Sequence, residues 1–139
     1  MTQQDASATA AIAEGRTSLG VELGSTNIKA CLIGPGCQVL ATGGHGWENQ
    51  FVDRLWTYSE NAIWTGLQAA VASLMADVER RHGVPLTRIG ALGFSAMMHG
   101  YLAFDANGAL LVPFRTWRNT NTERAAAEDR KSTRLNSSH

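Results

Sequence analysis

Residues 21–33 read VELGSTNIKACLI, and this stretch says more about the fold than any other part of the chain. An apolar strand runs into Glu22, a short polar turn follows at residues 24–26, and a second strand leaves with Lys29 near its start. A carboxylate, a lysine, two hydroxyls and a glycine are groups that can bind a phosphoryl group and its metal ion. The stretch is not a P-loop, because the pattern G-x-x-x-x-G-K-[ST] is absent. Taken alone, it is more typical of an ordinary β-hairpin, whose turn favours glycine and serine.

A three-stranded meander is predicted around this turn. Residues 18–22 and 27–33 form the hairpin itself, and residues 38–45 read as a third strand after the Gly-Pro-Gly turn at residues 34–36. Two hairpins in succession give an antiparallel meander.

A long amphipathic helix is predicted next. Its apolar positions repeat with the period of an α-helix and are Ile63, Leu67, Ala70, Val71, Leu74 and Val78. Thr57 has capping-box spacing with Glu60, and Ser59 or Asn61 is an equal candidate for the N-cap. Gly83 suits the position just after the helix.

Further strands are predicted after the helix. Residues 89–95 are an apolar run of the kind buried on both faces of a sheet. Residues 101–104 and 110–112 read as short strands joined by a turn at Asn107-Gly108, whereas residues 48–59 lack a regular pattern. The order β-β-β-α-β-β-β predicts a mixed α/β sheet with a helix on one face.

The two ends of the chain have little apolar pattern. Residues 1–17 are rich in Ala, Thr, Gln and Ser and are predicted to form a flexible tail. Residues 129–139 are polar, which is typical of a disordered C-terminus, but they also match the translation of a sequencing-adapter DNA. We favour the second interpretation, in which Glu128 is the last natural residue and residues 18–128 form a partial domain.

Composition excludes several classes of protein. The formal net charge is zero, so nothing indicates a nucleic acid or an anionic membrane as partner. No apolar run has the length of a membrane span, and the N-terminus lacks a signal pattern. Cys31 and Cys37 do not form a C-x-x-C motif, and cytoplasm is the expected compartment.

Two later segments carry candidate ligand-binding residues. Residues 95–100, SAMMHG, follow the apolar strand directly, where an open α/β sheet usually binds its ligand. His99 suits a sugar hydroxyl, although a strand-end histidine bonded to backbone carbonyls, with both methionines in the core, is also expected of such a pattern. Residues 114–122, FRTWRNTNT, combine aromatic rings with hydrogen-bonding side chains, as sugar sites do. A solvated loop is the alternative there.

The order of these three motifs resembles the N-terminal domain of the FGGY family of carbohydrate kinases, which includes xylulokinase, ribulokinase and rhamnulokinase. That family has D-x-G-T/S-x-x-x-K, then I-G-x-S-x-x-M-H-G, then D-x-x-G-x-x-L-x-P running into W-x-D-x-R. The corresponding segments here are ELGSTNIK, LGFSAMMHG and DANGALLVPFRTWRNTNT. The match covers residues 18–128. It implies a ribonuclease H-like, or actin-like ATPase, fold, of which this chain holds the truncated N-terminal half of the first domain.

The resemblance also implies a reaction and its site residues. The reaction is transfer of the γ-phosphate of ATP to a hydroxyl of a small-molecule sugar or polyol. The residues expected at the phosphates are Glu22, Gly24, Ser25, Thr26 and Lys29, with Glu22 helping to place Mg²⁺. The residues expected at the substrate are Met98, His99, Trp117, Arg118 and Asn119.

This sequence departs from the family pattern in ways that leave the substrate unidentified. Asn119 and Asn121 stand where the family has Asp and Arg, and Glu22 stands where it has Asp. The family's catalytic aspartate is expected later in the domain and its adenosine site in a second domain, so this fragment is expected to be inactive. A homodimer of the full-length protein stays open. The alternatives are a fragment of an actin- or Hsp70-like ATPase, and a small non-catalytic sugar-binding module.

Overall fold

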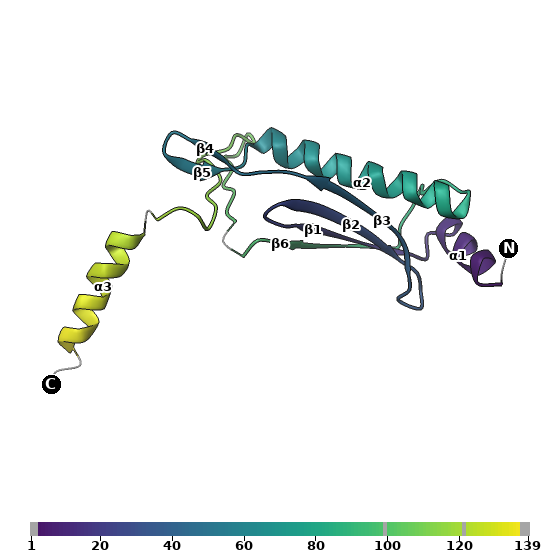
Figure 1. The fold of residues 1–139 in the computed structure, drawn as a ribbon, viewed down its shortest axis with the longest axis horizontal. Coiled ribbons are helices and arrows are strands. Elements are labelled where there is room, and N and C mark those ends of the chain that lie inside the picture. The colour runs from purple at the N-terminus through teal and green to yellow at the C-terminus, as the bar shows by residue number, and fades with distance from the viewer. Residues whose placement is uncertain (1–2, 99, 121, 137–139) are drawn as a thin grey trace.

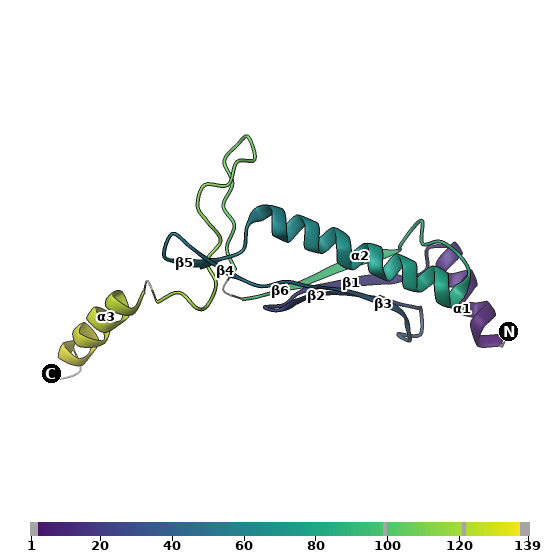
Figure 2. The ribbon, with the colours of Figure 1, turned by 45° about the horizontal axis from the view of Figure 1, so that its top comes forward.

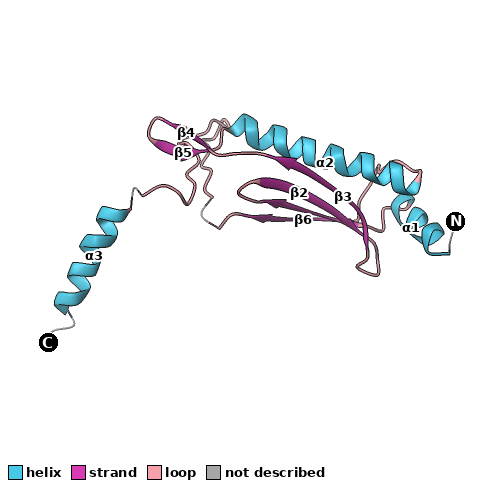
Figure 3. Ribbon diagram, in the orientation of Figure 1, coloured by secondary structure: helices cyan, strands magenta, loops and turns pink. Residues whose placement is uncertain are grey.

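The computed structural model describes residues 3–98, 100–120 and 122–136, and its centre is a four-stranded mixed sheet (Figures 1 and 3). The strands β1 (Ser18–Leu23), β2 (Asn27–Ile33) and β3 (Val39–Gly46) form an antiparallel meander. Strand β6 (Ala91–Ala96) lies parallel to β1, so the spatial order is β3-β2-β1-β6. The predicted meander and the predicted mixed sheet are confirmed.

Helix α2 (Glu60–His82) lies across one face of this sheet, along β3 and β2 (Figure 2). Ser59 is the N-cap among the three candidates, because its side chain accepts a hydrogen bond of 3.1 Å from the Ala62 N–H. Gly83 ends the helix with φ 68°, and its N–H donates to the Glu79 carbonyl at 2.8 Å. The predicted helix and its C-terminal glycine are confirmed.

The core lies between α2 and the sheet. Its fully buried side chains come from the meander and the helix and include Ile28, Leu32, Ala41, Ala70, Leu74 and Val78. Gly43 of β3 lets the two layers approach, since a Cβ at this position would lie 2.3 Å from the Ala70 carbonyl oxygen.

The crossover through α2 brings two sequence motifs to one edge of the sheet. Strands β3, β1 and β6 run in the same direction, and the helix carries the chain from β3 to β6. Leu23 at the end of β1 is paired with Ala96 at the end of β6. The turn at residues 24–26 and the loop after β6 therefore begin side by side.

The predicted N-terminal tail is wrong. Helix α1 (Gln3–Ala13) occupies this segment, and Ala8, Ala11 and Ile12 are buried. These positions have the i, i+3, i+4 spacing of one helix face. A stripe made mostly of alanine is weakly apolar, which is why the periodicity was not visible in the sequence.

Residues 48–59 are more regular than predicted. They contain a hairpin of β4 (Gln50–Val52) and β5 (Leu55–Thr57). Its two turn residues, Asp53 and Arg54, have φ angles of 48° and 65°. Such two-residue turns normally carry Asn-Gly or Asp-Gly, so Asp53-Arg54 does not stand out as a turn in the sequence.

Strand β6 exists as predicted, but its predicted burial on both faces is wrong. All six of its residues are exposed, including Leu92 and Phe94. It is the edge strand of the sheet, and α2 lies over β2 and β3 instead. The strand therefore has an uncovered apolar side among the described residues.

The two strands predicted after β6 are reduced to one bridge, between Phe104 and Leu110. The predicted turn between them is present, with Gly108 at φ 81°. The Asp105 carboxylate accepts hydrogen bonds from the N–H groups of Ala109 and Asn107, which lower the pKa of that carboxyl. The turn chemistry is local, whereas strand formation needs a partner that this segment lacks in the described structure.

Helix α3 (Glu123–Asn136) extends away from the sheet (Figures 1 and 2). Residues 129–136, which were expected to be irregular if they were an ordinary polar C-terminus, therefore belong to a helix. Its suggested adapter origin stays a prediction, because a helical backbone is compatible with either origin. None of the described helices is long and apolar enough to cross a membrane.

Candidate functional site

Two adjacent cavities share Ser25, at the tip of the β1–β2 hairpin. The first, which we call the methionine cavity, has a volume of about 250 Å³. It is lined by Ser25, Met97, Met98, Gly100, Phe114, Thr116 and Trp117. The second, the arginine cavity, has a volume of about 310 Å³ and is lined by Ser25, Thr26, Glu48, Asn49, Trp117 and Arg118. The structure thus brings together parts of all three sequence motifs.

The hairpin turn has a geometry that needs glycine at its first position. The Gly24 N–H donates to the Asn27 carbonyl at 3.0 Å, and a Cβ on Gly24 would lie 2.9 Å from that same oxygen. The Asn27 side chain donates to the Thr26 hydroxyl oxygen at 3.1 Å. Ser25 and Thr26 are exposed, so their hydroxyls and N–H groups are accessible to a ligand.

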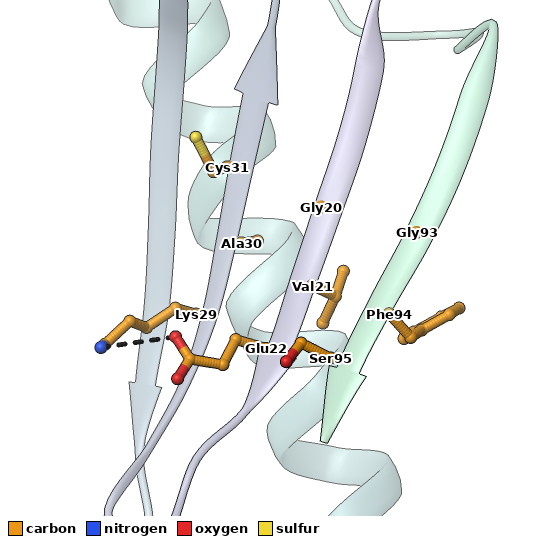
Figure 4. A pocket seen from close by; sticks show the side chains of 9 residues that line it. All are labelled: Gly20, Val21, Glu22, Lys29, Ala30, Cys31, Gly93, Phe94 and Ser95. Atoms are coloured by element: carbon orange, nitrogen blue, oxygen red, sulfur yellow. Dashed lines mark ion pairs between the residues drawn. The ribbon is translucent and has the colours of Figure 1, made fainter. Parts of the chain in front are cut away.

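Glu22 and Lys29 lie apart from these cavities, on the sheet face opposite α2 (Figure 4). They are cross-strand neighbours, and their charged atoms are 3.5 Å apart. Both side chains are more than half exposed, so the pair contributes little to stability. Ser95 of β6 lies beside Glu22 in the same row, and Gly20 and Gly93 leave the face around them open.

Glu22 can serve as a magnesium ligand only together with other donors. Mg²⁺ in phosphate-transfer sites is usually held by one or two carboxylates, by substrate phosphates and by water. Across the described ranges, no three His, Cys, Asp or Glu side chains are grouped to hold a metal ion. A single exposed carboxylate therefore fits an ion that arrives with a phosphate ligand, and does not fit an all-protein metal cage.

Asn119 uses its side-chain amide to bind backbone. Its oxygen accepts from the Trp56 N–H at 2.9 Å, and its NH₂ group donates to the carbonyls of Trp56 at 2.7 Å and Thr116 at 3.1 Å. Both N–H bonds of the amide are thereby engaged. The structure gives Asn119 the role of fastening the loop to β5, and its predicted contact with substrate stays a prediction.

Arg118 is held in place by two aromatic rings and an amide. Its guanidinium carbon lies 4.7 Å from the centre of the Trp56 ring and 5.9 Å from that of Trp117. It also donates to the Asn49 side-chain oxygen at 3.1 Å. A cation held in this way is ready to meet an anionic or hydroxylated ligand in the arginine cavity.

The remaining predicted substrate residues are open or undescribed. Met98 and Trp117 are 88% and 63% exposed, which leaves two apolar surfaces at the methionine cavity. His99 and Asn121 lie outside the described residues.

Trp47, Tyr58 and Asn49 were not singled out by the sequence motifs. The Trp47 indole N–H donates to the Gly24 carbonyl at 2.8 Å, and the Tyr58 hydroxyl donates to the Ser25 carbonyl at 2.5 Å. The aromatic richness of residues 47–58 was the available signal, but only the β4–β5 hairpin shows how the chain brings these rings to the turn.

Comparison with known proteins agrees with this geometry. The family model "FGGY family of carbohydrate kinases, N-terminal domain" matches residues 17–138. A gluconokinase of Bacillus subtilis is 30% identical over 105 residues, which are 76% of this chain and 20% of that protein.

Solved structures agree as well. A xylulose kinase from Brucella ovis superimposes with a TM-score of 0.68 at 24% identity, covering 81% of this chain and 23% of that one. A gluconate kinase from Lactobacillus acidophilus gives 0.65 at 18% identity, covering 84% and 22%. These neighbours have the actin-like ATPase fold, so the predicted fold class is confirmed. The chain spans about a fifth of the length of the relatives it matches.

Proposed function

Because this chain belongs to the FGGY family of carbohydrate kinases, we propose that it supplies one side of a kinase site. The reaction is transfer of the ATP γ-phosphate to a hydroxyl of a sugar, sugar acid or polyol. Phosphoryl transfer depends mainly on positioning and on neutralising charge, and both are tasks that turns, hydroxyls and cations perform.

The observation that carries the proposal is the position of Ser25 between the two cavities. The hairpin turn shares the methionine cavity with the loop after β6 and with residues 114–117, and it shares the arginine cavity with Trp117 and Arg118. A phosphate group at the turn would therefore lie next to a substrate seated against Met98 and Trp117. Exposed apolar surfaces flanked by polar groups are what a sugar ring requires.

The turn and the strands that flank it carry groups that fit a nucleotide phosphate and its metal ion. Ser25 and Thr26 of the turn would donate hydrogen bonds to phosphate oxygens. Lys29 on β2 would offset the phosphate charge, and Glu22 on β1 would hold Mg²⁺ on the sheet face beside the turn. Bound Mg²⁺ neutralises charge that builds up on the phosphate oxygens during transfer. The catalytic base is expected outside residues 1–128, so we propose that this chain alone does not turn over substrate.

Gluconate and xylulose are the substrates to test first, because relatives are named for them. Gluconate carries a carboxylate, which the Arg118 guanidinium would attract at the arginine cavity. We therefore propose that gluconate binds more tightly than xylulose, and that Arg118→Gln removes most of this preference.

Tryptophan fluorescence tests the substrate part of the proposal. Trp117 and Trp64 are similarly exposed, at 63% and 53%, but only Trp117 lines the two cavities. Gluconate should change the emission of the wild type and of Trp64→Phe to the same extent, and the change should be much smaller in Trp117→Phe, where Trp56 beside Arg118 is the remaining tryptophan near the ligand. An unchanged emission in the wild type, or a response of full size in Trp117→Phe, would contradict the proposed substrate site.

Activity measurements test the proposed kinase reaction and the expected position of the catalytic base. The gene product extended to the length of its relatives should phosphorylate one of these sugars with ATP, whereas the 139-residue chain should not. Turnover by the short chain would refute the expected position of the base. Lack of activity of the long product on any sugar, sugar acid or polyol would contradict the kinase proposal.

A further inference from the structure

All three carbonyl oxygens of the hairpin turn accept hydrogen bonds from two aromatic residues. The Gly24 carbonyl accepts from the Trp47 indole N–H at 2.8 Å, and the Thr26 carbonyl accepts from the Trp47 backbone N–H at 3.1 Å. The Ser25 carbonyl between them accepts from the Tyr58 hydroxyl at 2.5 Å. The turn is therefore fixed on its carbonyl side by two residues that the phosphate-binding motif does not include.

This fixing determines where the N–H groups of the turn point. In a trans peptide the carbonyl and the N–H of one unit point in opposite directions. The Gly24 carbonyl shares its peptide unit with the Ser25 N–H, and the Ser25 carbonyl shares its unit with the Thr26 N–H. Because both carbonyls point to the aromatic side chains, both N–H groups point away from them. Neither N–H has an acceptor among the residues that the structure describes.

The aromatic side chains are themselves rigidly held. Trp47, Tyr58 and Phe114 form a cluster with exposed fractions of 8%, 2% and 7%. The rings of Trp47 and Tyr58 stack with centres 4.1 Å apart, and Phe114 meets Tyr58 edge-on at 5.7 Å. A buried hydroxyl and a buried indole N–H that both have acceptors give the turn a fixed support.

The same cluster reaches the other two motifs. Phe114 lines the methionine cavity and packs against Gly100, where a Cβ would lie 2.9 Å from the ring. The Thr116 N–H donates to the Trp56 carbonyl at 3.2 Å, two residues before Tyr58. Tyr58 itself contacts the turn at Ser25 and also Phe114, which begins the segment of residues 114–119 that we call the substrate loop.

We propose that Trp47 and Tyr58 are positioning residues for the phosphate-binding turn, and this proposal rests on the proposed function. They hold the carbonyls of Gly24 and Ser25 so that the N–H groups of Ser25 and Thr26 face an incoming phosphate. Neither aromatic residue touches the nucleotide. A pair of N–H groups aligned before binding costs less entropy to engage than a mobile turn.

Tyr58→Phe is the sharpest test, because it removes only the hydroxyl. The chain has one other tyrosine, Tyr101, which is 67% exposed and lines neither the methionine cavity nor the arginine cavity, so Tyr101→Phe is the matched control. In the ligand-free chain, Tyr58→Phe should move the ¹³C resonance of the Ser25 carbonyl and the amide resonance of Thr26. The dissociation constant for MgATP should rise about fivefold, as expected for one neutral hydrogen bond. Tyr101→Phe should leave all of these unchanged.

Trp47→Phe is the second variant, with Trp64→Phe as its control. It should move the Gly24 carbonyl and the Ser25 amide resonances and weaken MgATP to a similar degree. The thermal midpoint of each variant, measured in parallel, separates loss of positioning from loss of folding. If both variants unfold, amide exchange of the native chain remains decisive: the Ser25 and Thr26 amides should exchange fast while their resonances stay sharp and single.

The outcomes separate the two proposals. Unchanged Ser25 and Thr26 resonances in Tyr58→Phe, or unchanged MgATP affinity in a folded variant, would overturn the positioning role and leave the kinase proposal standing. No binding of MgATP by the wild type, with resonances that still move in Tyr58→Phe, would contradict the phosphate site and support the positioning of the turn. Broad or doubled resonances of the turn in the native chain would also overturn the positioning role of Trp47 and Tyr58.

Discussion

The half of the sheet formed by β2 and β3 and the opposite edge formed by β6 have similar apolar strands, but only the first is covered. We call these the packed side and the open side of the sheet. Ile28 and Leu32 of β2 are fully buried beneath α2, whereas Leu92 and Phe94 of β6 are 52% and 61% exposed. An apolar groove of about 420 Å³ lies between α2 and β6, with Trp64, Phe94 and Tyr101 among its lining residues. An apolar run thus forms a strand from its local sequence, while its burial depends on elements elsewhere in the fold.

The candidate site lies on the boundary between these two sides. The hairpin turn is fixed by buried aromatic side chains, whereas Met98 and Trp117 across the cavity are largely exposed. The turn, which is the proposed phosphate-binding part of the site, is therefore supported by a packed core, whereas the proposed substrate-binding part is built on loops.

Glycines on the two sides give the strongest test of this contrast. Gly43→Ala should destabilise the protein by about 3 kcal/mol or prevent folding, because its Cβ would lie 2.3 Å from the backbone of α2. Gly93→Ala on β6 is the matched control, since nothing lies within 4 Å of its Cβ, and should change stability by less than about 0.5 kcal/mol. Chemical denaturation measures both, and equal effects would remove the contrast.

Truncated leucines should show the same difference with a smaller effect. Leu74→Ala leaves a cavity beneath α2 and should cost about 2–4 kcal/mol. Leu92→Ala removes a half-exposed side chain and should cost less than about 1 kcal/mol. A comparable loss for both in denaturant titrations would mean that β6 is covered in solution.

Asn119→Asp tests how the substrate loop is fastened. A carboxylate cannot donate to the carbonyls of Trp56 and Thr116, so the variant should lose about 1–2 kcal/mol at neutral pH. Part of that loss should return in acid, where the protonated carboxyl regains one donor. If the Asn119→Asp variant were as stable as the wild type at pH 7, the hydrogen bonds donated by the Asn119 amide would not be what holds the loop to β5.

The lowered pKa of Asp77, on the packed side of the sheet, should make the stability of the protein depend on pH in acid. Its carboxylate accepts first from the Thr42 N–H and also from Arg81, which together lower its pKa from 3.8 to about 2. Because the folded pKa lies below the unfolded one, the stabilisation is complete above about pH 4 and disappears as the pH falls toward 2. Thermal midpoints between pH 5 and 2 should fall less steeply for Asp77→Asn than for the wild type. Parallel curves would contradict this.

Local features of the fold were predictable from the sequence, and tertiary ones were not. The hairpin around residues 24–26 and the C-terminal Gly83 of α2 follow from chemistry within a few residues, whereas the N-cap was narrowed only to three candidates, of which Ser59 is the one used. Helix α1 was missed because its buried stripe is mostly alanine, and the β4–β5 hairpin because its turn, Asp53-Arg54, lacks glycine.

The candidate site divides in the same way. The motifs predicted that the turn meets the later loops, and the shared cavities around Ser25 agree with that. The engagement of Asn119 with Trp56, and of Trp47 and Tyr58 with the turn, depends on how distant segments pack, so no spacing in the sequence could indicate it.

We propose that the turn at residues 24–26 binds the phosphates of ATP. Titration of the ¹⁵N-labelled chain with MgATP, followed by NMR, measures this binding residue by residue. We expect saturable changes that are largest at the amides of Ser25 and Thr26, with smaller ones at Lys29 and none along α1. The absence of any change at the turn, or changes centred on another part of the chain, would contradict it.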